Sequence, residues 1–274
     1  MTTAPGQTAP DRYALDNARE GAAGMLDCLS VILDQSTMEL LAALVPLRGR
    51  CLELGAGNGS VARWMGDAVG RDGRVVATDI KPELVRADVA SHPRVEVIRH
   101  DLRTDPLPTG PFDVVHARLL FAHLGGRDVL LPTLCEVLAP GGVLVIEEWG
   151  GAGPGQVLSS PWSETVELYQ RYQQALMAMF AAAGNDSTWS VRVHRVMAAA
   201  GLVDVRTTVR ARSWTGGTAG CRLPIEVSGQ VRDKLIEHGL DAEDLDVLRA
   251  HLTDPRVVVL GNLTWSIVGH KSAG

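Results

Sequence analysis

Residues 51–60, which read Cys-Leu-Glu-Leu-Gly-Ala-Gly-Asn-Gly-Ser, constrain the fold of this chain more than any other stretch. The apolar start of this run predicts a buried strand, and Val61-Ala-Arg-Trp-Met after it predicts the beginning of a helix. Three glycines within five positions are more than a strand end requires. They indicate a turn where a ligand approaches bare backbone, because a Cβ would collide with it and because glycine tolerates positive φ.

A second apolar strand follows about 20 residues later and ends at Asp79. In an open parallel sheet this position lies at the carboxyl edge, where a carboxylate can accept hydrogen bonds from a ribose diol. The glycine turn and Asp79 together predict a ligand that contains adenosine.

The spacing of the glycines separates two kinds of adenosine ligand. Dinucleotide sites favour G-x-G-x-x-G, whereas Gly55, Gly57 and Gly59 follow G-x-G-x-G and Ser60 stands where the third glycine would fall. Glu53 precedes the turn, and an anion beside a pyrophosphate would be unfavourable. The acid suits an ammonium group instead, although a nicotinamide-dependent oxidoreductase could also use Asp79.

The joint pattern Glu-x-Gly-x-Gly-x-Gly followed by Asp79 resembles the S-adenosylmethionine site of the class I methyltransferases. His100-Asp101-Leu102 and the run Leu-x-Pro-Gly-Gly-x-Leu-x-Ile at residues 138–146 extend the resemblance over roughly residues 50–150. It implies a Rossmann-like α/β fold whose mostly parallel seven-stranded sheet has helices on both faces. It also implies S-adenosylmethionine as cofactor and S-adenosylhomocysteine as product.

The resemblance also implies a set of cofactor-binding residues. Asp101, which follows the third predicted strand, would accept the adenine amino group, and its alternative is an ordinary turn aspartate. Arg118 would bind the cofactor carboxylate, and its alternative is a surface arginine. The set comprises Tyr13, Glu53, Gly55, Ala56, Gly57, Asp79, Ile80, Asp101, Leu102 and Arg118.

Methyl transfer is an in-line displacement that requires a dry, aligning pocket and no metal or catalytic triad. An oxygen or nitrogen acceptor needs a base, and histidine is the first candidate. His116 and His123 follow the predicted fourth strand, and Glu148 ends the fifth. The alternatives are local packing for His116, a helix cap for His123 and a solvated acid for Glu148. The other histidines are too scattered to predict a metal site.

The remaining segments predict helices around this core. We expect an N-terminal helical lid at residues 1–48, with helices at 11–33 and 36–45, Ser36 as cap and Glu39 completing a capping box. A structural cover is the alternative. Residues 49–274 form the predicted methyltransferase domain, with cap insertions at about 151–185 and 214–255. Further helices are expected at 82–90, 161–183 and, as a pair, 224–252. A final strand is expected at 256–270, broken at 261–262, and the resemblance implies that it lies antiparallel beside strand 202–212.

Composition limits the partners. The net charge of −6 without a basic tract disfavours nucleic acid and anionic membranes. No apolar run approaches membrane-spanning length and the first ten residues do not read as a secretory signal, so we expect a cytoplasmic protein with reduced cysteines. The N-terminal helix could alternatively dock on a second copy and produce a homo-oligomer.

The predicted cap supplies apolar and aromatic side chains at Trp162, Tyr169, Met177 and Phe180 rather than charges. They favour a small, largely apolar or aromatic acceptor, most plausibly from specialised metabolism such as antibiotic biosynthesis. Whether oxygen, nitrogen or carbon receives the methyl group stays open. A catalytically silent binding subunit with the same fold is a further alternative.

Overall fold

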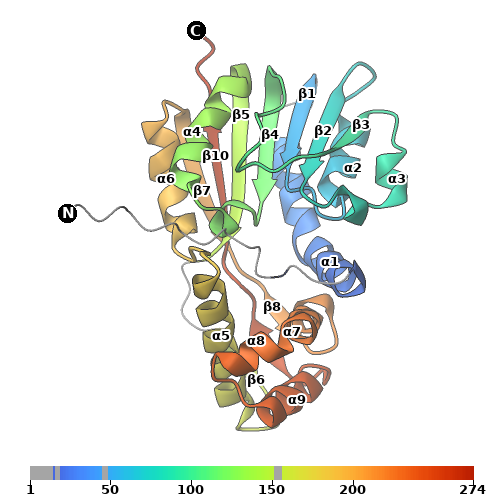
Figure 1. Ribbon diagram of the computed structural model, residues 1–274, viewed down its shortest axis with the longest axis vertical. Helices are drawn as coiled ribbons and strands as arrows, with labels where there is room; N and C mark the ends of the chain where they lie inside the picture. Colours follow the sequence, from blue (N-terminus) through green and yellow to red (C-terminus); the bar gives the residue numbers. More distant parts are fainter. Residues whose placement is uncertain (1–14, 16–18, 45–48, 151–155) are drawn as a thin grey trace, which may run out of the picture.

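The computed structural model describes residue 15 and residues 19–44, 49–150 and 156–274. Its frame is a seven-stranded sheet with strand order β3-β2-β1-β4-β5-β10-β7 (Figure 1). Strands β1 to β5 pair in parallel, and β10 runs antiparallel to both β5 and β7, so the predicted Rossmann-like sheet and its antiparallel ending are confirmed. The strands are β1 (Arg50–Leu54), β2 (Arg74–Asp79), β3 (Val95–Arg99), β4 (Phe112–Arg118), β5 (Leu138–Trp149), β7 (Val203–Arg210) and β10 (Thr264–His270).

Helices cover both faces of this sheet, because the central strands bury side chains on both sides. Alternate residues of β1 divide between two cores: Leu52 and Leu54 pack with α4 (Arg127–Val137) and α6 (Trp189–Ala199), whereas Cys51 packs with α1 and α2. Helix α2 (Ser60–Ala68) directly follows the glycine turn.

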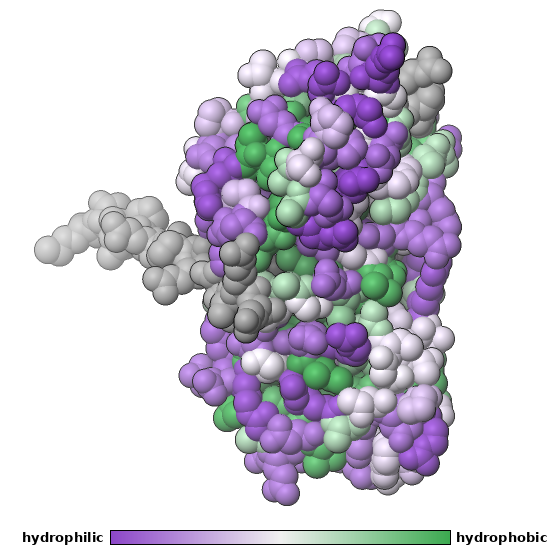
Figure 2. Space-filling model, turned by 90° about the vertical axis from the view of Figure 1, so that its right-hand side faces the viewer, coloured by the Kyte–Doolittle hydropathy of each residue, from purple (hydrophilic) through white to green (hydrophobic). Residues whose placement is uncertain are grey.

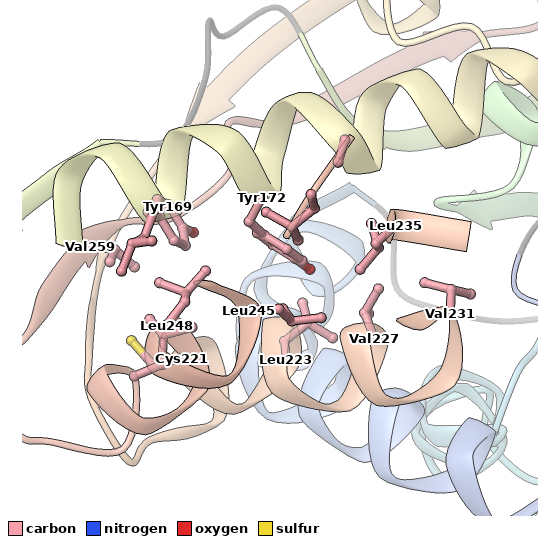
Figure 3. Close-up of a cluster of buried hydrophobic side chains, with 14 of the residues drawn as sticks. Tyr169, Tyr172, Cys221, Leu223, Val227, Val231, Leu235, Leu245, Leu248 and Val259 are labelled. Atoms are coloured by element: carbon pink, nitrogen blue, oxygen red, sulfur yellow. The ribbon is translucent and has the colours of Figure 1, made fainter. Parts of the chain in front are cut away.

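A second body lies below the main sheet in the view of Figure 1. It comprises α5 (Thr165–Ala182), α7 (Ala219–Gln230), α8 (Arg232–Glu237), α9 (Ala242–His251) and a small sheet of order β6-β9-β8, with β6 at Val157–Ser159, β8 at Ser213–Thr215 and β9 at Val258–Leu260. Figure 3 shows Tyr169 and Tyr172 of α5 extending toward Leu245 and Leu248 of α9. In Figure 2, apolar side chains are visible among polar ones near the middle of the molecule, where the two bodies meet.

Helix α1 (Arg19–Leu44) is one continuous helix, which corrects the prediction of two helices divided before Ser36. The Ser36 hydroxyl donates to the Leu33 carbonyl oxygen (2.9 Å), so it bonds within the helix instead of capping a new one. Because α1 is long, it contacts both α2 beside the main sheet and α7 in the second body.

Three other segments differ from prediction. Residues 82–90 form a 3₁₀ turn (Pro82–Leu84) and a short α3 (Ala87–Ala90), and residues 224–252 lie in three helices. The final strand is interrupted at residues 261–263, close to the predicted break, and its two parts, β9 and β10, pair in different sheets. Within the described ranges, no helix is both long and apolar enough to cross a bilayer.

Candidate functional site

A cavity of about 1260 Å³ lies where the carboxyl ends of β1, β2, β4 and β5 meet α1, α5 and α7. Single small-molecule sites commonly have volumes of about 300–1,000 Å³, so this cavity has room for two small molecules. One end is lined by the glycine turn and by acids that follow the strands, and the other end is lined mainly by apolar and aromatic side chains.

The glycine turn forms part of the cavity wall through Gly55, Ala56 and Gly57. Gly55 (φ 68°) and Gly57 (φ 57°) both have left-handed backbone conformations, which side chains with a Cβ rarely adopt. The amide of Ala56 donates to the carbonyl oxygen of Thr78 (2.9 Å), which ties the turn to the end of β2. The turn therefore presents fixed bare backbone to the cavity, as its sequence predicts.

Asp79 lines the cavity beside Ile80 and supports the same turn. Its Oδ2 accepts from the amide of Gly57 (2.9 Å), and its Oδ1 accepts from the amide of Lys81 (2.8 Å). Each carboxylate oxygen has more than one lone pair, so both remain able to accept from a ligand. The position suits an acceptor for a diol.

Asp101 and Leu102 also line the cavity, at the end of β3. The Asp101 carboxylate accepts from Arg103 at Nε (2.9 Å) and Nη2 (2.7 Å), and this hydrogen bonding lowers the pKa of Asp101. Leu102 is buried and belongs to the core between the sheet and helices α4 and α6. The pair therefore offers an ionised acceptor next to an apolar wall.

Arg118 lines the cavity, but its guanidinium is engaged with α1. Nη2 donates to Asp34 Oδ1 (2.9 Å) and Nη1 donates to Thr37 Oγ1 (3.0 Å). The structure thus gives Arg118 partners other than the predicted cofactor carboxylate. Tyr13, the second residue predicted for that end of the cofactor, lies outside the described residues.

The α1 contacts form a polar stripe that the sequence reasoning missed. Asp34 also accepts from the hydroxyl of Ser60 (3.0 Å), and Ser30 Oγ accepts from Asn58 Nδ2 (3.0 Å). The signal was present in the sequence as polar residues at helical spacing beside an apolar stripe. The polar stripe comprises Asp27, Ser30, Asp34 and Thr37, and the apolar side that lines the cavity comprises Ala22, Met25, Leu26 and Leu29.

His116 lies beneath the cavity rather than in it. Its side chain is fully buried and does not line the cavity, and its two ring nitrogens contact Glu53 Oε2 (2.7 Å, from Nδ1) and Glu147 Oε2 (3.4 Å, from Nε2). Burial alone would lower the pKa of His116, but the two carboxylates outweigh it and raise the pKa to about 9. This placement contradicts the prediction that His116 is a general base, because the ring cannot reach an acceptor.

Glu53 is the member of this group that lines the cavity, and Glu147 lies deeper, on β5. Burial would raise the pKa of Glu147, but His116, Ser266 and Thr37 stabilise its charged form and lower the pKa to about 2. The sequence reasoning did not single out Glu147, because alternation along β5 cannot show what a buried acid meets on other strands.

His123 and Glu148 both line the cavity. His123 Nδ1 lies 2.9 Å from Asn185 Nδ2, its ring meets Phe180 edge-on, and burial lowers the pKa of His123 to about 4. Glu148 Oε1 accepts from the amides of Phe121 (2.7 Å) and Ala122 (3.3 Å). Burial nevertheless raises the pKa of Glu148 to about 8, so the alternative of a solvated surface acid is wrong.

The apolar end of the cavity is built by α1, α5, α7 and aromatic residues at the sheet edge. Trp162 is a correction, since it stacks on His251 (4.1 Å between ring centroids) and does not line the cavity. Among the described residues, no cluster of His, Cys, Asp and Glu could hold a metal ion. The apolar end includes Trp149, Tyr169, Tyr172, Leu176, Met177, Phe180, Trp214, Leu223 and Val227.

Comparison with known sequences agrees with this site. A family profile described as "Methyltransferase domain" matches residues 51–142, which favours a methyltransferase over the nicotinamide oxidoreductase alternative. Methyltransferase str3 of Strobilurus tenacellus is 34% identical over 101 residues, covering 36% of this chain and 35% of that protein. Trans-aconitate 2-methyltransferase of Azoarcus sp. is 35% identical over 114 residues, covering 39% of this chain and 42% of that protein. The match thus spans less than half the length of these relatives.

Solved structures share the fold over most of the chain. A putative methyltransferase from Bacillus halodurans C-125 has a TM-score of 0.53 at 17% identity, covering 87% of this chain and 99% of that chain. Phosphoethanolamine N-methyltransferase 2 of Haemonchus contortus, in complex with S-adenosyl-L-methionine, has a TM-score of 0.57 at 16% identity, covering 97% of this chain and 61% of that chain. Residues 51–142 therefore match a methyltransferase domain family, and the chain as a whole shares the fold of these methyltransferase structures.

Proposed function

We propose that this protein transfers a methyl group from S-adenosylmethionine to a small, largely apolar or aromatic acceptor and releases S-adenosylhomocysteine. The observation that carries the proposal is that one cavity joins Glu53, the glycine turn, Asp79 and Asp101 at one end to apolar and aromatic side chains at the other. Donor and acceptor would thereby meet without crossing solvent, which an in-line displacement requires.

The residues at the polar end fit the chemistry of the donor. Glu53 would receive its ammonium group, Asp79 with Ile80 the ribose, and Asp101 with Leu102 the adenine, while the bare backbone of the glycine turn allows close approach. When bound, the sulfonium supplies an electrophilic methyl group. Arg118 and Tyr13 remain candidates to bind the carboxylate of S-adenosylmethionine. Arg118 would then be shared between that carboxylate and Asp34.

Glu148 is the better candidate for the base that accepts a proton from the methyl acceptor. A general base works best when its pKa lies near the operating pH, and the pKa of Glu148 is raised to about 8 by burial. His123 has a pKa lowered to about 4, so it is neutral but weakly basic. We propose that His123, held by Asn185, orients the acceptor while Glu148 takes its proton.

The second body and α1 support the proposed cap. Residues of α5 and α7 provide the apolar wall, which agrees with cap insertions at about 151–185 and 214–255 in a methyltransferase domain of residues 49–274. Helix α1, from the proposed lid at residues 1–48, lines the same cavity with its apolar side. A homo-oligomer through this segment is a further proposal.

The acceptor class rests on the cavity, since the names of the relatives do not agree on one. They include a trans-aconitate 2-methyltransferase, a ribosomal protein L11 methyltransferase and a C-methyltransferase of ubiquinone/menaquinone biosynthesis. An apolar wall and a net charge of −6 favour a small metabolite of specialised metabolism over nucleic acid, and are compatible with a cytoplasmic protein.

Two measurements test the proposal. Calorimetry should show binding of S-adenosylhomocysteine and no binding of NADH. Transfer of labelled methyl groups to a panel of aromatic, terpenoid and peptidic acceptors should then identify the acceptor class, with Glu148→Gln as the catalytic control. Donor binding without transfer to any acceptor would favour the silent binding subunit, and preferential labelling of nucleic acid or protein would contradict the acceptor class.

A further inference from the structure

A row of buried polar side chains crosses four strands on the α1 side of the main sheet. Each member lies two positions along its strand from a residue of the core that α1 and α2 cover, so it faces the same side of the sheet and the row continues that core with polar side chains. The members are Glu53 of β1 (3% exposed), His116 of β4 (0%), Glu147 of β5 (1%) and Ser266 of β10 (2%).

The row is closed at its inner end. Ser266 Oγ donates to Glu147 Oε1 (2.6 Å), and Thr37 Oγ1 of α1 donates to Glu147 Oε2 (2.5 Å). With His116 also at its Oε2, Glu147 contacts three partners from three other elements. Its carboxylate is therefore fixed, and it fixes the plane of the His116 ring.

At the outer end the row opens on the cavity, and Glu53 is the member that lines it. His116 lies between the two carboxylates, and a neutral imidazole has one N–H, whereas only the imidazolium donates from both nitrogens. Two carboxylates and one imidazolium leave a formal charge of −1. Because buried charge is costly without a partner, a cation arriving at Glu53 would balance the row.

Arg118 does not supply that cation. Arg118 reaches Thr37, but its second Nη donates to Asp34, so this pair is neutral. The row therefore has a place for one positive group, at the cavity face of Glu53, which is where the donor's ammonium would lie.

We propose that His116 is a positioning residue for donor binding, which holds the Glu53 carboxylate toward the cavity and is itself held by Glu147. This inference rests on the proposed function, in which Glu53 receives the ammonium group. His116 then acts on one end of the donor alone, because Asp79 and Asp101 follow different strands and make no contact with the row that the structure records.

Two ligands separate this role from a general effect on folding. S-adenosylhomocysteine carries the amino acid end, and 5′-methylthioadenosine has the same adenosine but lacks that end. His116→Asn in the full chain should lower the affinity for S-adenosylhomocysteine about tenfold or more, because a charge-assisted hydrogen bond to Glu53 is lost. The affinity for 5′-methylthioadenosine should change less than about twofold. Both constants are measured by calorimetry.

His251→Asn is the matched control, since it also removes a buried imidazole, hydrogen-bonded to Thr165 Oγ1 (2.9 Å), outside the cavity lining. It should leave both affinities unchanged. Glu147→Gln is a milder second variant for the case that His116→Asn fails to fold. It should also lower the affinity for S-adenosylhomocysteine and leave the affinity for 5′-methylthioadenosine unchanged.

The outcomes are distinct. A loss of affinity for S-adenosylhomocysteine alone supports the positioning role. An equal loss of affinity for both ligands, or no loss for either, overturns it, because His116 would then serve the fold alone. If the wild-type protein binds neither ligand, the proposed donor site is rejected, and this inference is rejected with it.

Discussion

Replacing Glu148 by glutamine should change how stability depends on pH. Glu148 is 1% exposed, and its Oε1 accepts from the amides of Phe121 and Ala122. A glutamine carbonyl oxygen can accept the same two hydrogen bonds, and its volume is similar. The substitution therefore removes a titrating group from a buried position and keeps the local contacts.

The sign follows from the direction of the pKa shift. Burial raises the pKa of Glu148 from 4.5 to about 8, so between these values the folded protein keeps a proton that the unfolded chain has released. The stabilising contribution is complete below the unfolded pKa and is lost as pH rises through the folded pKa. The free energy of unfolding should fall by about 1.4 kcal/mol per pH unit in this window, on the order of 5 kcal/mol in all.

Urea unfolding of both proteins at a series of pH values from about 5 to 8 measures this slope. Subtracting the curve of Glu148→Gln cancels the other titrating groups, so the remaining slope belongs to Glu148. If both proteins show the same dependence on pH, the reasoning is refuted: the amides of Phe121 and Ala122 would then outweigh burial and keep the carboxylate charged in the folded state.

Three further substitutions test other parts of the structure. Asp79→Ala should weaken S-adenosylhomocysteine by about 1–3 kcal/mol in calorimetry, because an acceptor for the ribose diol is lost, and unchanged binding by a folded variant would reject the assignment. Tyr172→Ala should lower the free energy of unfolding in urea by about 3–5 kcal/mol, since its side chain is 2% exposed in the core of the second body. Asp34→Ala removes the acceptor for Arg118 and Ser60, so amides of α1 should exchange faster with solvent, and equal exchange rates would show that this carboxylate does not anchor the helix.

The sheet and the polar end of the cavity could be read from the sequence because their signals are local. Glu53 and the glycines lie within one short run, and Asp79 and Asp101 each follow an apolar strand. Parallel pairing brings such strand ends to one edge, so residues far apart in the chain become neighbours without further information. The same rule places Glu148 at that edge.

The helical segments were read less well. The Ser36 and Glu39 spacing matched a capping box, yet α1 continues through it, because a serine hydroxyl can also bond to a carbonyl of the preceding turn. Near the C-terminus, residues that read as one broken strand belong to two sheets, because β9 pairs with β6 and β8 whereas β10 pairs with β5 and β7.

The sequence by itself determined the fold class and the polar end of the cavity, since strand ends, glycine spacing and acids act through their neighbours in the chain. Only the tertiary structure decided the surroundings of His116, Glu147 and Glu148. Charge state and reach depend on burial and on partners that are distant in the chain: His116 lies 63 positions from Glu53, and Thr37 lies 110 positions from Glu147. A histidine at a strand end reads the same whether it faces a cavity or two buried carboxylates, and only the packed sheet distinguishes them.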